Sequence, residues 1–402
     1  MEKIALLGGN PVREKKLFYG RQWIDETDIT AVNEVLRSDF LTGGPAVRAF
    51  EEKLQNYTGG KYGVAVSSGT AALHCACIAA EIGPGDEVIV AALTFMPSAN
   101  CVLYCGGKPV FADVDPQTLN IDPKSIVEHI TPCTKAVIAV DFAGQPVACE
   151  EIRRICDEHG LIFIEDAAHS LGSEYNGKKV GSLADLTCFS FHPVKTITSG
   201  EGGAVTTDNE EFYNRLLLAR NHGMTRDEAQ MEEAPHEGPW YNEQLILGYN
   251  YRLSDMQCAL LSSQLDRIDS FVLRRKEIMK RYDAAFGNMP ELRLPKQIAA
   301  ADTCCHIYIV NLELEELSCT RREFYDAMSA ENVQCHVQYV PVYWHPFYKK
   351  LGYARELCSE TEKIYSTIMT LPLYPKMTEQ DVEDVIKAVK KVAAWYSKRR
   401  KI

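Results

Sequence analysis

The 402-residue sequence has no apolar run long enough to cross a bilayer, and the apolar stretch at its N-terminus is too short for a signal peptide. We therefore expect a cytoplasmic protein. It also lacks a surplus of positive charge, since 43 basic residues against 55 acidic ones give a formal net charge of -12. Nucleic acids and anionic membranes select basic surfaces, so we expect neither as a partner.

The fourteen cysteines lack the spacing of a structural metal site. Cys75 and Cys77 are separated by one residue and Cys101 and Cys105 by three, whereas a structural zinc site uses two matching pairs at two-residue spacing. Disulfide frameworks are typical of small secreted domains, and here the cysteines are scattered through a long chain. We expect reduced, mostly buried thiols and no metal.

At this length the chain reads as two domains, or as one large domain with a lobe. Several short β-rich runs between residues 60 and 210 are continuously apolar, as strands covered on both faces must be. Helical stretches such as Thr70–Ile82 and Glu150–His159 fall between them. The pattern predicts an α/β domain around a mostly parallel sheet. The predicted strands are Gly63–Val66, Glu87–Ala91, Pro109–Ala112, Ala136–Val140, Ile162–Glu165, Thr187–Ser190 and Ala204–Thr207.

The C-terminal part of the chain predicts a smaller α+β lobe without obvious chemistry of its own. A long amphipathic helix is expected from its N-cap at Ser254 to about Phe286, connecting the two parts. We place an N-terminal arm and the large domain in residues 1–265 and the small domain in residues 266–402. The lobe's predicted elements are strands at His306–Leu312 and Cys335–Tyr339 and helices at Arg321–Ala330 and Gln380–Tyr396.

Two short segments carry the chemistry. Asp166 ends one apolar strand, and Lys195 lies just past another, followed by the glycine-rich run Gly200–Gly203. Pyridoxal phosphate (PLP) needs an amine for its Schiff base and an anion against its ring nitrogen, which Lys195 and Asp166 can supply. The lysine must be unprotonated part of the time, and a positively polarised cofactor nearby lowers its pKa.

A third segment, Ser67-Ser68-Gly69-Thr70-Ala71-Ala72, follows the first strand and opens a helix. Amides and hydroxyls exposed at a helix N-terminus form a phosphate site, although for this segment alone an ordinary N-cap is the favoured interpretation. Asp166 alone could likewise be a helix cap, and Lys195 an exposed loop lysine. All three segments follow strands whose carboxyl ends form the ligand crevice of a parallel sheet, and that coincidence favours a PLP site.

Phe95 follows the second predicted strand, where an aromatic ring could stack on the pyridine ring of PLP. Core packing is an equally good interpretation of this residue from the sequence.

These motifs together resemble the DegT/StrS family of nucleotide-sugar aminotransferases, which are fold-type I PLP enzymes. The resemblance extends in order over nearly the whole chain, including Gly-Glu-Gly-Gly-Ala-Val from Gly200 and Gly-Tyr-Asn-Tyr-Arg-Leu-Ser-Asp from Gly248. It implies that Lys195 forms the Schiff base, Asp166 binds the pyridine nitrogen and His169 contacts a cofactor oxygen. The lysine places the chain with the aminotransferases, since histidine replaces it in the family's dehydratases.

The same resemblance implies the remaining cofactor contacts and a homodimer with shared active sites, in which the Asn250–Arg252 segment reaches the phosphate of the other subunit's cofactor. The implied cofactor-binding residues are Ser68, Gly69, Thr70, Ala71, Phe95, Asp166, His169, Ser190, Lys195, Asn250 and Arg252.

Within the family, the phrases at Ser173–Gly181 and Phe191–Lys195 are most similar to enzymes that transfer an amino group from L-glutamate to carbon 4 of a UDP-linked 4-keto-6-deoxy-N-acetylhexosamine. The chain departs from them at Gln338, where a histidine is expected. The implied substrate contacts are Tyr19, Leu41, Thr42, Gly43, Gly44, His192, His336, Val337, Gln338 and Tyr339.

Three alternatives stay open from the sequence. The chain could aminate carbon 3, or carbon 4 of a dTDP- or GDP-linked sugar, because the sugar-facing residues are few and lie on loops. It could be a non-catalytic regulator on the same fold, which the intact Lys195 and Asp166 pair disfavours. An NAD-dependent oxidoreductase lacks support, because no glycine fingerprint follows the first strand.

Overall fold

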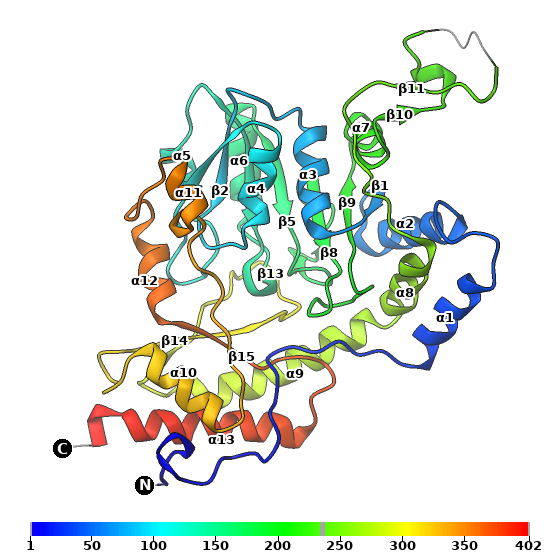
Figure 1. The fold of residues 1–402 in the computed structure, drawn as a ribbon. Helices are drawn as coiled ribbons and strands as arrows, with labels where there is room; N and C mark the ends of the chain where they lie inside the picture. Colours follow the sequence, from blue (N-terminus) through cyan, green and yellow to red (C-terminus); the bar gives the residue numbers. More distant parts are fainter. Residues whose placement is uncertain (1, 234–237, 401–402) are drawn as a thin grey trace.

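The computed structural model describes residues 2–233 and 238–400. A seven-stranded sheet is part of this structure, and a sheet lies at the centre of the larger lobe (Figure 1). The strand order is β1-β9-β8-β5-β4-β2-β3, and only β9 runs antiparallel to its neighbours within this sheet. All seven predicted strands are present, with ends within two residues of the prediction. They are β1 (Tyr62–Val66), β2 (Glu87–Ala91), β3 (Lys108–Ala112), β4 (Thr134–Val140), β5 (Ile162–Asp166), β8 (Leu186–Ser190) and β9 (Gly203–Thr207).

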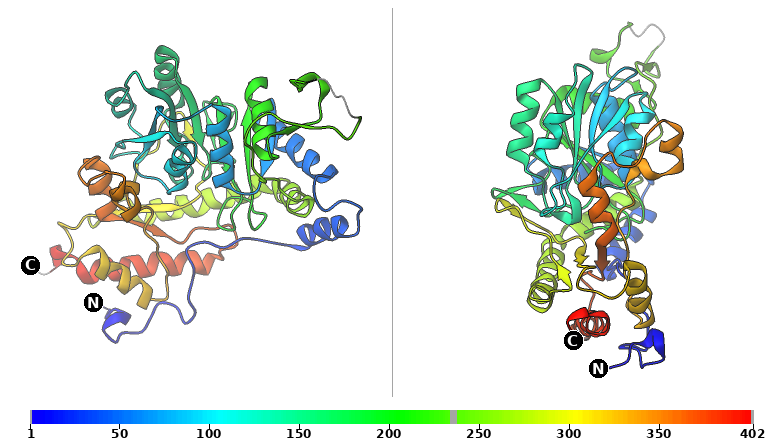
Figure 2. Two further views of the ribbon diagram at one scale, coloured as in Figure 1. Left: turned by 45° about the horizontal axis from the view of Figure 1, so that its top comes forward. Right: turned by 90° about the vertical axis from the view of Figure 1, so that its left-hand side faces the viewer.

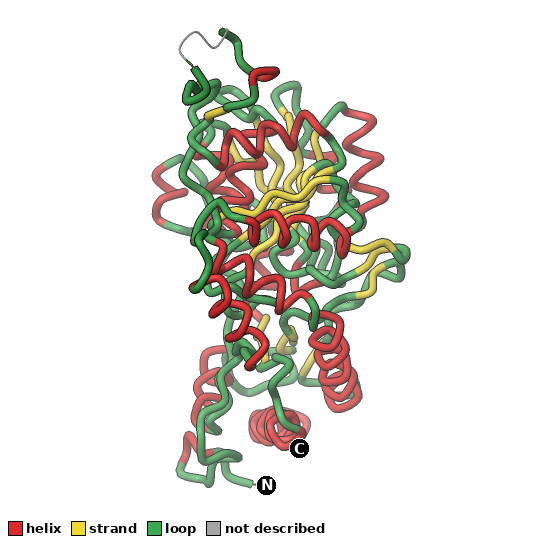
Figure 3. Tube along the Cα trace, turned by 90° about the vertical axis from the view of Figure 1, so that its right-hand side faces the viewer, coloured by secondary structure: helices red, strands yellow, loops and turns green. Residues whose placement is uncertain are grey.

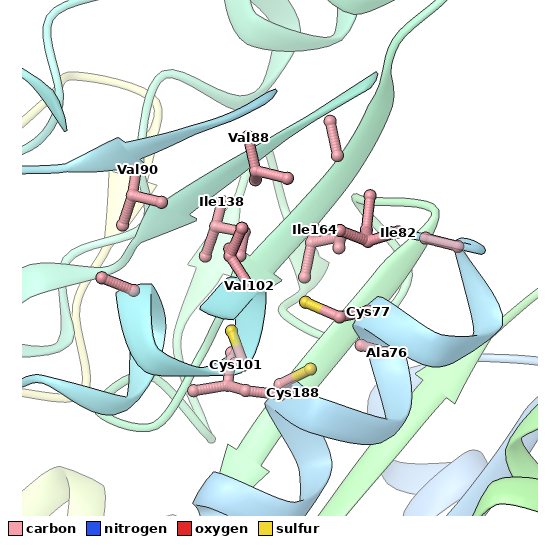
Figure 4. Close-up of a cluster of buried hydrophobic side chains, with 14 of the residues drawn as sticks. Ala76, Cys77, Ile82, Val88, Val90, Cys101, Val102, Ile138, Ile164 and Cys188 are labelled. Carbon is pink, nitrogen blue, oxygen red and sulfur yellow. The ribbon is translucent and has the colours of Figure 1, made fainter. Parts of the chain in front are cut away.

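Helices cover both faces of this sheet (Figure 3), and the alternation of side chains along each strand explains why. In β2, Val88 and Val90 pack in one cluster with α3 (Gly69–Ala79) and α4 (Pro97–Tyr104), as Figure 4 shows. Ile89 and Ala91 belong to a cluster with residues of α5 (Pro123–Glu128) and α6 (Cys149–His159). A strand buried on both faces has to be apolar throughout, as the sequence predicted.

Further helices surround the sheet and join it to the rest of the chain. They are α1 (Glu26–Leu36), α2 (Pro45–Thr58), α7 (Glu210–Arg220), α8 (Asp255–Leu265) and α9 (Ile268–Phe286). Two small sheets lie beside the main sheet. One has three strands, β6 (Glu174–Tyr175), β7 (Lys178–Lys179) and β13 (Ala301–Asp302), and the other has two, β10 (Met224–Thr225) and β11 (Glu243–Gln244). The β10–β11 segment projects from the upper right of the larger lobe in Figure 1.

The single long helix predicted from Ser254 to Phe286 is wrong, because the chain forms two helices that are broken after Leu265. Ser254 is the N-cap of α8, as predicted. At the break, Arg267 forms ion pairs with Asp25 and Asp28, at the start of α1. Each of the two helices buries one face, so the apolar periodicity continues across the break. The sequence pattern therefore does not indicate where α8 ends and α9 begins.

The smaller lobe packs helices on a three-stranded antiparallel sheet. Its helix at Arg321–Ala330 is present with the predicted bounds, but the strand predicted at Cys335–Tyr339 is wrong. Only His336 pairs there, in an isolated bridge with Thr370, and the following residues turn toward the larger lobe. The elements are β12 (Leu292–Arg293), β14 (Tyr308–Leu312), β15 (Ile368–Leu371), α10 (Arg321–Ala330), α11 (Pro346–Lys350), α12 (Ser359–Thr367) and α13 (Glu379–Tyr396).

The N-terminal arm is fastened to the smaller lobe, where both ends of the chain lie (Figure 2). The buried Glu331 carboxylate accepts hydrogen bonds from the amides of Ala5 and Val12 and pairs with Lys391 at 3.0 Å. Leu17 bridges to Val333, which brings the next part of the arm to the junction of the lobes. The domain boundary at 265/266 stays a prediction, and Tyr343, beyond that boundary, packs in the core of the larger lobe.

All fourteen cysteines are free thiols and eleven of them are buried, in agreement with the prediction. Among residues 2–233 and 238–400, no helix is both long and apolar enough to span a membrane.

Candidate active site

A cavity of about 450 Å³ opens at the carboxyl edge of the central sheet, where the three predicted segments meet. Residues that follow β1, β2, β5 and β8 line it together with the N-terminal arm and the smaller lobe. The predicted site residues among its walls are Tyr19, Ser68, Gly69, Thr70, Phe95, Asp166, His169, Ser190, His192, Lys195, His336, Gln338 and Tyr339.

Lys195 lies in the loop after β8, with only part of its side chain exposed. Its backbone amide donates to the carbonyl of His192 at 2.9 Å, which fixes the turn that carries it. Burial lowers the pKa of Lys195 to about 8, although the negative charge of Asp166 opposes that effect. The side chain can therefore lose and regain a proton near neutral pH, as an amine that forms a Schiff base must.

Asp166 is the last residue of β5 and its carboxylate is buried in the cavity wall. Burial raises its pKa, while the hydroxyl of Ser98 at 2.6 Å, the amide of Ala168 at 3.2 Å and the charge of Lys195 oppose that shift. These donors satisfy one lone pair on each oxygen. The carboxylate is thus held in one orientation inside the cavity.

The first turn of α3 approaches β8 closely enough to form one rounded wall. A Cβ atom on Gly69 would lie 2.7 Å from Cβ of Ser190, so only glycine allows this approach. Gly203 serves the same purpose in β9, where a Cβ would lie 2.4 Å from the carbonyl oxygen of Ser68. Ser68 caps α3 by accepting from the amide of Ala71 at 3.1 Å. The segment is therefore an N-cap and a concave wall at a helix N-terminus, where a phosphate is favoured.

His169 joins the cavity to the smaller lobe. Its Nε2 lies 3.2 Å from the hydroxyl of Tyr339, and its ring lies 4.4 Å from that of His306 between centroids. Burial lowers the pKa of both histidines well below the usual value, and the charge of Lys195 adds to the effect. Both rings are therefore neutral at physiological pH. His306 and Tyr339 thus bring the smaller lobe into contact with this site.

Phe95 is 52% exposed, and its ring centroid lies 5.5 Å from that of Tyr339 at the cavity. The core-packing interpretation of Phe95 is therefore wrong. Tyr19 and His336 face each other at 5.0 Å between ring centroids, which brings the N-terminal arm against the smaller lobe at the same cavity.

Two predicted groups do not line this cavity. The turn from Leu41 to Gly44 lies against the segment that contains Arg252, because Asp255 donates its amide to the carbonyl of Leu41 at 3.1 Å and Thr42 bridges to Ser254. Gly43 and Arg252 instead line a second cavity of about 460 Å³. Ala71, Val337 and Asn250 are also absent from the walls of the first cavity, and the amide of Ala71 is already bound by Ser68.

The sequence analysis did not single out Thr94 and Ser98, which line the cavity, or His306, whose ring packs against that of His169. Ser98 donates to Asp166 and lies 2.6 Å from the hydroxyl of Thr94. Both hydroxyls flank Phe95 in the segment after β2, so their position at a strand end was a usable signal. His306 gave no such signal, because only the packing of the lobes brings it to His169.

The residues present fit PLP. A partly buried amine and a buried, hydrogen-bonded carboxylate lie in the walls of one cavity, as the cofactor's carbonyl carbon and ring nitrogen require. Gly69 packs directly against Ser190, so the N-terminus of α3 and the end of β8 form one continuous cavity wall against which a phosphate can lie. His169 Nδ1 is buried without a hydrogen-bond partner among the described residues, so its ring is held by packing and by Tyr339.

Comparison with known proteins gives related sequences over most of the chain. "Spore coat polysaccharide biosynthesis protein SpsC" of Bacillus subtilis is 39% identical over 382 residues, which are 94% of this chain and 98% of that protein. "UDP-4-amino-4,6-dideoxy-N-acetyl-beta-L-altrosamine transaminase" of Campylobacter jejuni is 36% identical over 372 residues, which are 91% of this chain and 95% of that protein.

Solved structures show the same fold. Helicobacter pylori PseC, "aminotransferase involved in the biosynthesis of pseudoaminic acid", matches with a TM-score of 0.88 and 30% identity, over 95% of this chain and 100% of that chain. The PLP form of the Streptococcus pneumoniae putative sugar aminotransferase Spr1654 matches with a TM-score of 0.87 and 29% identity, over 94% and 99% of the two chains.

The family model for DegT/DnrJ/EryC1/StrS aminotransferases matches residues 22–390, which include the predicted catalytic pair Lys195 and Asp166. The mostly parallel sheet and the α/β class agree with the structures of these PLP enzymes. Family model, relatives and structures thus agree over nearly the full length. The chain belongs to the DegT/DnrJ/EryC1/StrS aminotransferase family and is a PLP-dependent sugar aminotransferase.

Proposed function

We propose that this sugar aminotransferase transfers the amino group of L-glutamate to carbon 4 of a UDP-linked 4-keto-6-deoxy-N-acetylhexosamine. The product is UDP-4-amino-4,6-dideoxy-N-acetyl-β-L-altrosamine, an intermediate of pseudaminic acid biosynthesis. The observation that carries the proposal is the similarity to the Campylobacter jejuni transaminase, 36% identical over 91% of this chain. The structural likeness to Helicobacter pylori PseC, with a TM-score of 0.88, supports the same substrate.

Bound PLP supplies the electron sink and carries the amino group between donor and acceptor. Lys195 holds the cofactor and, once displaced, moves a proton through its Nζ atom. Burial lowers its pKa to about 8, so this amine can both release and take up a proton near neutral pH. The same atom therefore serves as base and acid in the two half-reactions.

The other residues bind and orient. Asp166 presents a fixed anion to the ring nitrogen, and the wall formed by Ser68, Gly69, Thr70 and Ser190 receives the phosphate at the N-terminus of α3. Tyr19, His336, Gln338 and Tyr339 line the same cavity, and we assign them to the sugar. Gln338 is held there by a hydrogen bond from Thr370 at 3.0 Å, so its position is defined although its residue type is unusual.

We further propose that the enzyme is a homodimer whose active sites are shared. Arg252 and the Leu41–Gly44 turn lie together at a second cavity, so one chain does not bring all predicted site residues to Lys195. Large apolar side chains near this turn are exposed, including Phe40 at 55% and Leu36 at 54%, and such residues are typical of an interface. A cytoplasmic location stays a prediction from the sequence.

The visible spectrum of the PLP-loaded protein tests the proposed reaction. L-Glutamate should bleach the yellow band, and UDP-4-keto-6-deoxy-N-acetyl-L-altrosamine should restore it, with the aminated sugar identified by mass spectrometry and its C4 position by NMR. Bleaching by glutamate with recovery only by dTDP-linked, GDP-linked or 3-keto sugars would contradict the proposed substrate but would support the aminotransferase reaction. Absence of bleaching by glutamate would overturn the donor.

Lys195→Ala separates the catalytic proposal from a regulatory one. The variant should lose the yellow band and at least about a hundredfold of turnover, since positioned acid–base groups contribute that much or more. Lys178→Ala, which changes an exposed lysine on β7, is the control and should behave as wild type. Full turnover in Lys195→Ala would refute the assignment.

A further inference from the structure

We propose that Ser98 is a positioning residue that keeps Asp166 anionic and aimed at the cofactor's ring nitrogen, and that Thr94 in turn holds Ser98. Ser98 Oγ lies 2.6 Å from Asp166 Oδ2, and Thr94 Oγ1 lies 2.6 Å from Ser98 Oγ. All three side chains line the cavity of Lys195, and both hydroxyl residues are 1% exposed. The inference depends on the family's cofactor and is independent of the sugar's identity.

The number of available hydrogens determines which group donates in each of these two hydrogen bonds. A hydroxyl has one hydrogen to donate, and Ser98 directs it to Asp166, whose carboxylate can only accept when ionised. The carbonyl of Phe95 is a more distant acceptor for Ser98, at 3.2 Å. Thr94 must therefore donate to Ser98, so the two hydroxyls are aligned to favour the negative charge on Asp166.

A hydroxyl in this place matters because Asp166 is buried. Burial favours the protonated acid, and a protonated Asp166 cannot act as the counter-anion of a pyridinium. Three groups oppose the rise in the pKa of Asp166 that burial causes. The hydrogen bond from Ser98 lowers the pKa most, followed by the amide of Ala168 and the charge of Lys195. Removing the hydroxyl leaves Oδ2 buried without its donor.

Other titratable groups surround Asp166 and belong to several elements: Lys195 after β8, Cys188 in β8, Glu165 in β5, Asp141 after β4 and Tyr339 in the smaller lobe. Burial raises the pKa of Glu165 to about 7, so this group can titrate in the same range as the bound cofactor. If Glu165 contributes to the titration of the visible PLP band, Glu165→Gln will change that titration. The Glu165→Gln variant and its combination with Ser98→Ala therefore separate the contribution of Glu165 from that of Ser98. A change at Ser98 leaves these groups in place.

The fold supplies a matched control in Ser170. Its hydroxyl also donates to a buried aspartate, Asp141 Oδ2, at 2.5 Å, and the residue is fully buried. Neither Ser170 nor Asp141 lines the cavity. Ser98→Ala and Ser170→Ala therefore each remove one buried hydroxyl from a carboxylate, but only the first carboxylate faces the cofactor.

The experiment compares both variants without any sugar. In full-length protein, Ser98→Ala should raise the dissociation constant of PLP about tenfold, because a bond to a charged group is lost. The pH at which the visible band of bound PLP titrates should move upward, since an unprotonated ring withdraws less charge from the bond to Lys195. Ser98→Thr, which keeps the hydroxyl, should restore both values, and Thr94→Val should shift them in the same direction by less.

Ser170→Ala should lower the melting temperature and leave PLP affinity and the band's titration unchanged. If Ser98→Ala behaves like Ser170→Ala, with lower stability and a normal cofactor spectrum, Ser98 is structural only and the proposal is wrong. If Ser98→Ala fails to fold, Thr94→Val decides, and wild-type affinity together with an unchanged titration in that variant overturns the proposal.

Discussion

The hydroxyl of Tyr339 lies 3.2 Å from Nε2 of His169, and this contact joins the smaller lobe to the cofactor cavity. The two residues are 170 positions apart in the sequence. Burial raises the pKa of Tyr339 and lowers that of His169, so both side chains are uncharged at physiological pH. The contact is therefore an ordinary hydrogen bond that positions a neutral imidazole beside Lys195.

Tyr339→Phe removes this hydrogen bond and keeps the aromatic ring. We expect turnover to fall about three- to tenfold, the cost of one neutral hydrogen bond, while PLP affinity changes little. Steady-state kinetics and PLP titration measure the two effects. Tyr308→Phe, which removes a 2.7 Å bond to Asp283 within the smaller lobe and away from this cavity, is the control. Unchanged turnover in Tyr339→Phe would show that His169 does not need this partner.

Lys195 is expected to destabilise the protein without cofactor. Its pKa falls from 10.5 to about 8 on folding, so below pH 8 the native state holds a partly buried ammonium at a cost that disappears as the pH rises toward 10.5. Lys195→Met should therefore raise the free energy of unfolding at pH 7 by about 1–2 kcal/mol, after allowance for water in the cavity. Denaturant unfolding of both PLP-free proteins at several pH values measures this difference in stability. A stabilisation by Lys195→Met that increases with pH would contradict the lowered pKa of Lys195.

Gly69→Ala should weaken cofactor binding. The new Cβ would lie 2.7 Å from Ser190 Cβ, so the start of α3 has to move away from β8 and the phosphate wall opens. We expect PLP affinity to fall about tenfold, equivalent to about 1.4 kcal/mol. Gly83→Ala is the matched control, because nothing lies within 4 Å of its Cβ position. Equal PLP titrations for the two variants would rule out this role for Gly69.

Shared active sites predict complementation between inactive subunits. Lys195→Ala and Arg252→Ala should each be inactive as homodimers, because each removes one part of both sites. After unfolding and refolding an equal mixture, half of the dimers are mixed and one site in each contains both native residues. Activity should recover to about a quarter of wild type, as half of the dimers carry one working site of two. A mixture that stays inactive would place Lys195 and Arg252 in sites that are not shared.

Much of this protein followed from the sequence. The strands of the sheet were predictable because several of them are continuously apolar, as strands covered on both faces must be, and that constraint is local. Asp166, Lys195 and the Ser68–Thr70 segment were predictable as a site because each follows a parallel strand, and such strands end at one edge. The sequence thereby determined the fold class and the cofactor, and it predicted the pair Lys195 and Asp166 that the structure brings to one cavity.

The tertiary structure decided what depends on contacts between distant segments. At the break between α8 and α9, Arg267 pairs with Asp25 and Asp28, and no local pattern encodes a pairing across 239 residues or more. The approach of Tyr339 to His169 likewise depends on how the lobes pack, as does the exposure of Phe95. Hydrophobic periodicity shows which face of a helix or strand is buried. It does not show which distant segment packs against that face, because that depends on the tertiary fold of the whole chain.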